Sequence, residues 1–121
     1  MELKRVVVTG LGALTPVGNN VAETWENLVK GISGAGPITH FDASKFKTHF
    51  ACEVKNFNGT DYIDRKELRK MDLYTQYAIA AAKEAVEDSG MDLEKEDLNR
   101  IGVIYGVGLS LIHISEPTRP L

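Results

Sequence analysis

The chain has 121 residues, of which 43% are hydrophobic and 26% are charged, a composition that fits a soluble globular protein. Its formal net charge of −3 argues against a general binder of nucleic acid or of anionic membranes. A single cysteine, Cys52, excludes an internal disulfide and fits a reducing compartment. The apolar run from Val6 to Val8 is too short for a secretory signal, so we expect a cytoplasmic protein.

The first predicted element is a buried strand over residues 4–9, because this segment is rich in β-branched residues and ends at a glycine. Residues 10–18 contain glycine and proline and are expected to form a loop or an irregular extension of the strand. A helix from Val21 to about Lys30 follows, with Asn20 as its N-terminal cap and Gly31 as its end.

The middle of the chain contains turn signals and shorter elements. Residues 34–37, Gly-Ala-Gly-Pro, have the composition of a turn. Residues 50–57 alternate in polarity well enough to predict a short strand. Asp64 is then placed to cap a brief helix that runs through Lys70.

A longer helix is predicted from Leu73 to Ser89, with Asp72 as its cap and Gly90 as its end. Small side chains on this helix would let a neighbouring segment approach closely: Ala78, Ala80, Ala81, Ala82 and Ala85. Residues 100–106 are predicted to form the next buried strand.

The last segment has a different character. Residues 109–119, Leu-Ser-Leu-Ile-His-Ile-Ser-Glu-Pro-Thr-Arg, resemble an in-frame translation of a sequencing-library transposase adapter. We therefore expect residues 1–108 to carry the evolved sequence and residues 109–121 to be a non-native tail. The apolar run over residues 101–114 is interrupted by polar residues and is shorter than the ~20 residues of a spanning helix, so we expect no membrane segment.

Strands that alternate with helices predict an α/β layered architecture with a parallel component. Parallel strands are usually buried on both faces, and they need covering layers that 108 residues cannot all supply. The pattern therefore predicts the N-terminal portion of an α/β fold, incomplete by itself.

Gly10-x-Gly12 after a predicted strand resembles the opening of a dinucleotide-binding loop, in which glycines let the backbone approach a pyrophosphate. Thr15 occupies the position of the third glycine, Pro16 follows it, and the helix begins only at Val21. Nucleotide binding is therefore the weaker interpretation of this loop.

Neither the cysteine nor the histidines form a convincing reactive cluster. Cys52 lies in the middle of a predicted strand without an adjacent base or cation, so we expect an inert thiol. The histidines, His40, His49 and His113, lack the spacing of a metal site with each other or with the cysteine. We expect no metal and no cofactor.

The segment Arg65-Lys66-Glu67-Leu68-Arg69-Lys70 is strongly basic. On a helix, Lys66, Arg69 and Lys70 stand at i, i+3 and i+4, so their cationic ends would share one face. An ordinary solvated face is one interpretation. The other is a docking patch for an acidic partner, whose encounter rate such charges would raise.

Seven motifs in the order and spacing of this chain resemble the opening of the β-ketoacyl-[acyl-carrier-protein] synthase II family. They are Arg5-Val6-Val7-Val8-Thr9-Gly10-Leu11-Gly12, Thr15-Pro16-Val17-Gly18-Asn19, Thr24-Trp25, Gly31-x-Ser33-Gly34, Phe41-Asp42, Arg65-Lys66-Glu67-x-Arg69-Lys70-Met71-Asp72 and Arg100-Ile101-Gly102…Gly106-Val107-Gly108. The resemblance is collinear over residues 3–108 and is greater to the stand-alone enzymes than to the modules of large polyketide synthases.

The resemblance implies a thiolase-like fold, two α/β halves layered αβαβα, in a homodimer that elongates fatty acids. Such enzymes move an acyl group from carrier protein onto a cysteine and condense it with malonyl-carrier protein, with loss of carbon dioxide. The nucleophilic cysteine and two assisting histidines lie downstream of position 108 in the family. Cys52, His40 and His49 do not match their contexts, so we expect no catalytic residue in this chain.

The resemblance also bears on the basic segment. Lys66, Arg69 and Lys70 align with the patch by which the family binds the acidic acyl carrier protein, in its acyl-loaded and malonyl-loaded forms. Arg65 belongs to the same stretch but is expected to lie partly off that face.

Three alternatives remain open at the level of sequence. A chain-length-factor-like subunit would share the fold but lack the nucleophile. The 121 residues could instead form a small carrier-protein-binding module. A nucleotide-binding oxidoreductase would have to bind a dinucleotide despite Thr15.

Overall fold

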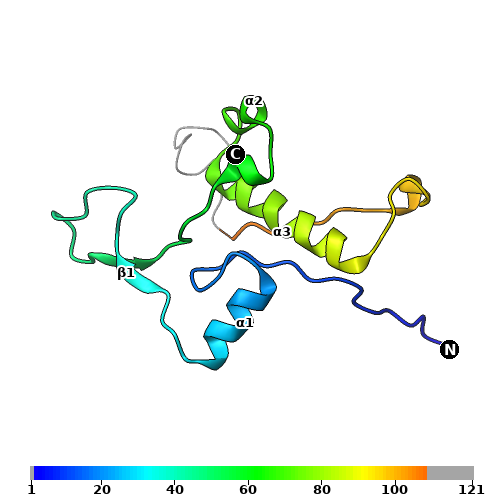
Figure 1. Ribbon diagram of the computed structural model, residues 1–121, viewed down its shortest axis with the longest axis horizontal. Helices are drawn as coiled ribbons and strands as arrows, with labels where there is room; N and C mark the ends of the chain where they lie inside the picture. The colour runs from blue at the N-terminus through cyan, green and yellow to red at the C-terminus, as the bar shows by residue number, and fades with distance from the viewer. Residues whose placement is uncertain (1, 109–121) are drawn as a thin grey trace.

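A computed structural model describes residues 2–108 of the chain, and the predicted tail at 109–121 lies outside the described residues (Figure 1). The elements are α1 (Val21–Val29), β1 (Ala35–Pro37), β2 (Phe50–Cys52), the 3₁₀ turn η1 (Gly59–Asp61), α2 (Arg65–Leu68), α3 (Leu73–Ser89) and the 3₁₀ turn η2 (Leu98–Arg100). Within the described part of the chain, no helix combines the length and the apolar character needed to cross a membrane.

Helix α1 begins and ends where its local signals predict. The Asn20 side chain accepts a 2.8 Å hydrogen bond from the amide of Glu23, which satisfies one of the free N–H groups of the first turn. At the other end, Gly31 has a φ of +73°, and its amide donates to the carbonyl of Leu28. A glycine adopts this left-handed conformation without steric cost, so the predicted helix end is confirmed.

Helix α3 also has its predicted bounds, but one end forms differently from the expectation. Gly90 closes the helix with a φ of +69°, as expected for a C-terminal glycine. Asp72 occupies the cap position, yet its side chain makes no cap hydrogen bond.

Helix α2 is shorter than predicted. It ends at Leu68 and not at Lys70, because the amide of Lys70 bonds to the carbonyl of Glu67, three residues back, and tightens the chain into a turn. Asp64 precedes the helix but forms no side-chain cap bond. The predicted i, i+3, i+4 arrangement therefore extends beyond the helix itself.

The two predicted buried strands do not form within residues 2–108. Residues 4–9 and 100–106 contain no strand, and their apolar side chains are open to solvent, with Val6 90% and Ile104 98% exposed. A strand needs a neighbouring backbone to bond with, and no described segment pairs with either stretch. The sheet of the described residues is the two-stranded β1–β2 pair, which is antiparallel, so the predicted parallel component is absent from this part.

The prediction of a turn at residues 34–37 is wrong. Residues 35–37 form β1 and pair with β2 in the register Ala35↔Cys52, Gly36↔Ala51 and Pro37↔Phe50. Long-range pairing with a segment thirteen or more residues away overrides the local turn composition. The predicted strand over 50–57 is confirmed only in its first part, Phe50–Cys52.

The glycine-rich segment 10–13 lies along α3, which organises the described residues (Figure 1). A side-chain carbon at Gly10 would come within 2.6 Å of the amide nitrogen of Ser89, and one at Gly12 within 2.8 Å of that of Ala85. The prediction that small residues on this helix admit a close neighbour is thereby confirmed. The glycines pack against the side of a helix and not against a helix N-terminus.

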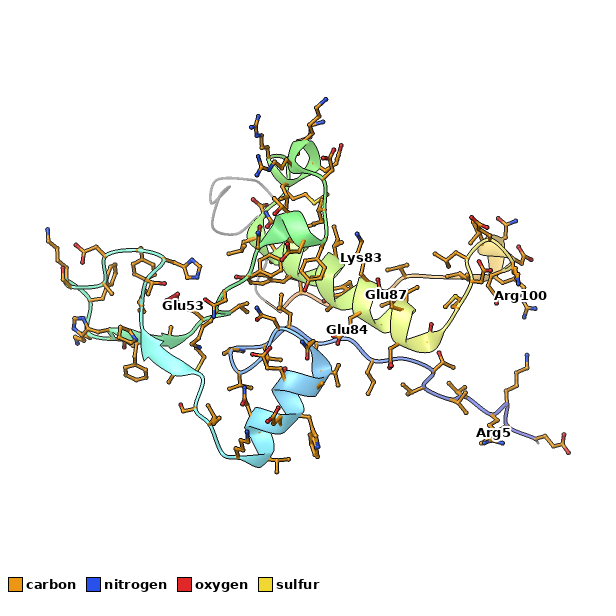
Figure 2. All side chains as sticks on the ribbon, viewed as in Figure 1. Arg5, Glu53, Lys83, Glu84, Glu87 and Arg100 are labelled. Atoms are coloured by element: carbon orange, nitrogen blue, oxygen red, sulfur yellow. The ribbon has the colours of Figure 1, made fainter. Side chains whose placement is uncertain are left out.

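Acidic side chains of α3 fix this contact. The amide of Leu11 donates to Asp88 at 3.0 Å, and the amide of Ala13 donates to Glu84 at 2.9 Å. The second carboxylate oxygen of Glu84 accepts from the amide of Val21, the first residue of α1, at 3.0 Å. One carboxylate thus joins the loop, α1 and α3, and its negative charge lies at the positive end of α1 (Figure 2).

Candidate functional site

The basic segment lies on α2 and in the turn that follows it. Lys66, Arg69 and Lys70 are all exposed, and so is Arg65. No ion pair involves any of the four among residues 2–108. Figure 2 shows α2 at the top of the view, with nitrogen-tipped side chains that extend away from α3. We call Lys66, Arg69 and Lys70 the basic patch.

The turn η1 supports the basic patch from beneath. It contacts both α2 and α3. Gly59 is buried, and a side-chain carbon there would lie 2.7 Å from atoms of both Leu68 and Gln76. A larger residue there would have to displace the ends of both side chains, so glycine lets η1 pack against α2 and α3 together.

An aromatic group lies beside this turn. The ring of Phe57 stacks on Tyr62 with centroids 5.8 Å apart and meets Tyr77 edge to face at 5.0 Å. Such pairs stabilise packing beyond their area by about 1 kcal/mol each. They anchor the chain that leads into α2 on the first turns of α3.

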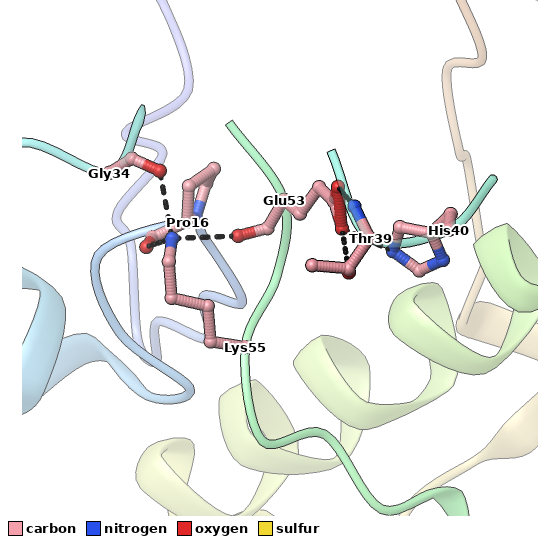
Figure 3. A network of polar contacts seen from close by, with 6 residues as sticks. All are labelled: Pro16, Gly34, Thr39, His40, Glu53 and Lys55. Atoms are coloured by element: carbon pink, nitrogen blue, oxygen red, sulfur yellow. Dashed lines mark hydrogen bonds and ion pairs between the residues drawn. The ribbon is translucent and has the colours of Figure 1, made fainter. Parts of the chain in front are cut away.

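A second polar cluster lies near β2 (Figure 3). The ammonium group of Lys55 donates to three carbonyl oxygens, those of Pro16 at 2.9 Å, Gly34 at 2.8 Å and Glu53 at 3.0 Å. The three acceptors belong to three different segments of the chain. Lys55 therefore ties the loop before α1 to the start of β1 and the end of β2.

The carboxylate of Glu53 is fully engaged in this cluster. It accepts 2.7 Å hydrogen bonds from both the amide and the hydroxyl of Thr39, and it lies 3.1 Å from Nε2 of His40 (Figure 3). The hydrogen bonds from Thr39 hold the pKa of Glu53 below its ordinary value. Burial raises the pKa of Tyr77, and the negative charge of Glu53 adds to that shift.

A cleft of about 390 Å³ opens beside this cluster. Its lining includes Thr39, His40, Glu53, Leu73 and Tyr77. The carboxylate in the cleft already has donors from the protein, so it is not free to orient a ligand. We assign the cleft no binding role.

The other candidate reactive residues are dispersed. Cys52 is an exposed free thiol on β2, while His40 lies beside Glu53 and His49 bonds through its carbonyl to Ile38. Within residues 2–108 no three histidine, cysteine, aspartate or glutamate side chains come together in a way that could hold a metal ion. His113 lies outside the described residues.

Sequence reasoning missed Glu53, Lys55 and Glu84, the residues with the most long-range polar contacts. Nothing in the local pattern distinguishes them from other charged residues, because most of their partners are backbone groups 14 to 71 residues away. The spacing of Glu84 and Asp88 by one helical turn beside a small-residue face was the available signal.

Comparison with known proteins identifies the family of this chain. The profile of the β-ketoacyl synthase N-terminal domain matches residues 3–118. The chain is 53% identical over 106 residues to 3-oxoacyl-[acyl-carrier-protein] synthase 2 of Staphylococcus aureus strain COL, which covers 88% of the chain and 26% of that protein. It is 47% identical over 116 residues to the protein of the same name from Vibrio harveyi, covering 96% of the chain and 28% of that protein.

Solved structures give a consistent result. The ishigamide ketosynthase/chain length factor matches with a TM-score of 0.68 and 41% identity over 73% of this chain and 22% of that one. A type II polyketide synthase ketosynthase in complex with its acyl-carrier protein matches with a TM-score of 0.63 and 31% identity, over 81% of this chain and 24% of that one. The chain therefore spans about a quarter of the length of these relatives and shares their ketosynthase fold over that part. By its sequence and its fold, it belongs to the β-ketoacyl synthase family.

Proposed function

We propose that this chain is the N-terminal portion of a 3-oxoacyl-[acyl-carrier-protein] synthase. The complete protein would condense an enzyme-bound acyl group with malonyl-carrier protein in fatty-acid elongation, with loss of carbon dioxide. The observation that carries this proposal is the 53% identity over 88% of the chain to a relative with that name. The chain itself is proposed to be inactive, because the family's nucleophilic cysteine and assisting histidines do not match any of its residues.

Within that protein, the basic patch is proposed to dock acyl carrier protein. Lys66, Arg69 and Lys70 are exposed and without ion-pair partners among residues 2–108, so their charges are available to an acidic surface. A ketosynthase that is 31% identical to this chain was solved with an acyl-carrier protein bound. Charges of this kind raise the association rate and make binding sensitive to salt.

The finer architecture belongs to the same proposal. We expect the complete protein to have the αβαβα layers of the thiolase fold, to form a homodimer and to work in the cytoplasm. The exposed apolar stretches around Val6 and Ile104 support the first point, because they supply strands for a sheet whose other members would come from outside residues 2–108.

The adapter origin of residues 109–121 also stays a proposal. It rests on the eleven-residue resemblance at 109–119, while the family profile extends to residue 118 and does not mark a boundary at 108. Resequencing the source DNA tests it. A genomic clone in which codons 109–119 continue unchanged into flanking coding sequence would overturn it.

Docking is tested by charge reversal in the full-length protein. Lys66→Glu combined with Arg69→Glu and Lys70→Glu is expected to weaken binding of carrier protein on the order of a hundredfold at low salt, as measured by fluorescence anisotropy. Arg65→Glu should weaken binding less. As a matched control, Lys45→Glu with Lys47→Glu reverses exposed charges in the connection between β1 and β2 and should leave binding nearly unchanged. Equal effects of the two sets would refute a specific patch.

A chain-length-factor-like subunit is the second candidate, because one structural relative is a complex of a ketosynthase with such a factor. The names of the relatives in Staphylococcus aureus and Vibrio harveyi favour the synthase. The complete gene separates the two: a synthase will encode the nucleophilic cysteine and will release condensation product from acyl- and malonyl-carrier protein, whereas the subunit will do neither.

A further inference from the structure

The basic patch belongs to a segment that is held at both ends by one helix. Residues 62–71 connect η1 to α3 and include α2. The ammonium group of Lys83 donates to the carbonyl of Tyr62 at the start of this segment. The side-chain amide of Gln76 donates to the carbonyl of Met71 at its end, at 3.3 Å.

These two hydrogen bonds hold in place a segment that packing alone would hold weakly. Helix α2 has only one turn, and its N-cap aspartate makes no side-chain cap bond, so the helix has little stability of its own. It contacts α3 mainly through η1. The two side-chain donors of α3 therefore fix where the segment begins and ends relative to the rest of the chain.

Lys83 is a cation like the residues of the basic patch, but its ammonium group lies in a different environment. Its ammonium group is bonded to a backbone carbonyl, and the side chain lines a cleft with Asp61, Glu84 and Glu87. Figure 2 shows Lys83, Glu84 and Glu87 together along α3, away from the tip of α2. A cation in acidic surroundings of this kind attracts an acidic partner less than the exposed patch does.

We propose that Lys83 and Gln76 are positioning residues that present the basic patch to the carrier protein. This inference rests on the proposed docking function. Neither residue needs to touch the partner: Lys83 acts through Tyr62, and Gln76 acts through Met71. Loss of either bond lets the segment move, so that binding has to order the segment again before all three cations contact the partner, and the affinity falls while the number of charge contacts stays the same.

The test compares three variants of the full-length protein by carrier-protein binding across a range of salt concentrations. Lys83→Met removes the ammonium group but keeps most of the apolar stem, and it is expected to weaken binding roughly three- to tenfold, the size that one charge-assisted hydrogen bond supports. The slope of affinity against salt should stay at the wild-type value, because no contact with the partner is lost. Lys83→Arg keeps a cationic donor and should restore binding. Gln76→Met should resemble Lys83→Met.

Lys95→Met is the matched control, since Lys95 is 84% exposed and carries the same charge in the connection between α3 and η2. It should bind like the wild type. Wild-type affinity in Lys83→Met overturns the inference, and so does a shallower salt slope, which would mean that Lys83 contacts the partner itself. If reversal of the basic patch also has no effect, the proposed docking function fails as well. If reversal of the patch weakens binding while Lys83→Met does not, only the positioning role fails.

Discussion

The segment 10–13 and the segments around Val6 and Ile104 teach different lessons about what holds a chain in place. The first is nearly devoid of large side chains, yet two carboxylates and two close glycine contacts fix it on α3. The other two are rich in β-branched residues, yet Val6 and Ile104 are almost fully exposed. Apolar side chains stabilise a strand only when another surface covers them. The hydrogen bonds and close contacts of segment 10–13 with α3 need no such additional covering surface.

The largest expected effect breaks the glycine contact. In Gly12→Ala, the new methyl group would overlap the carbonyl oxygen of Ala81 and approach the amide nitrogen of Ala85 to 2.8 Å. Because both atoms are helical backbone and cannot move aside easily, we expect a loss of about 3 kcal/mol in the free energy of unfolding, measured in urea. A side-chain carbon at Gly36 would have no atom within 4 Å, so the control variant Gly36→Ala should change stability little. A silent Gly12→Ala would mean that the segment does not lie on α3.

The next effect removes the carboxylate that joins loop and helices. Glu84→Ala leaves the amides of Ala13 and Val21 without their acceptor, and we expect about 2 kcal/mol of destabilisation in the same urea measurement. Glu84→Gln retains an acceptor oxygen but loses the charge at the start of α1, so it should cost about half as much. Glu87→Ala serves as the control, since its side chain makes no hydrogen bond among the described residues. Equal losses of stability in Glu84→Ala and Glu87→Ala would contradict the stabilising role of the Glu84 hydrogen bonds.

The sequence predicts an element of this fold when local contacts define it, and fails when the element depends on contacts between distant residues. The bounds of α1 and α3 were predictable, because Asn20, Gly31 and Gly90 act within a turn of the helix that they cap. The strand at residues 35–37 was not, because its pairing with residues 50–52 is long-range and competes with a local turn composition.

The same distinction between local and long-range contacts applies to the candidate site. The charges of Lys66, Arg69 and Lys70 follow directly from the sequence, and their exposure agrees with it. The hydrogen bonds that hold the patch segment do not follow from the sequence. Their donors, Gln76 and Lys83, lie ten or more residues downstream of Lys66, and each bonds to a backbone carbonyl that no sequence motif marks. Local rules therefore predict which charges exist, while the fold decides how they are presented.

A smaller effect sharpens the comparison between held and uncovered segments. Trypsin should cut the 121-residue chain after Arg5 and Arg100 on the order of tenfold faster than after Lys83. Figure 2 shows the two arginines on the outlying parts of the ribbon and Lys83 on α3. The rates would be compared by mass spectrometry of timed digests. Cleavage at all three sites at the same rate would show that α3 is no more protected than the outer segments.

The smallest effect concerns Glu53, which holds the connection after β1 as Glu84 holds the loop before α1. Its pKa is lower in the folded chain than its ordinary value of 4.5, so its contribution to stability is fully present above that pH and is lost as the pH falls through the lowered value. Below that point the protonated carboxyl is a weaker acceptor for Thr39, and the amide resonance of Thr39 should move in NMR spectra recorded from about pH 6 to pH 2. Glu53→Gln should abolish this movement, because the amide does not titrate in that range. A Thr39 resonance that moves equally in both proteins would assign the titration to another carboxyl, and Glu53 would then hold the connection by geometry alone.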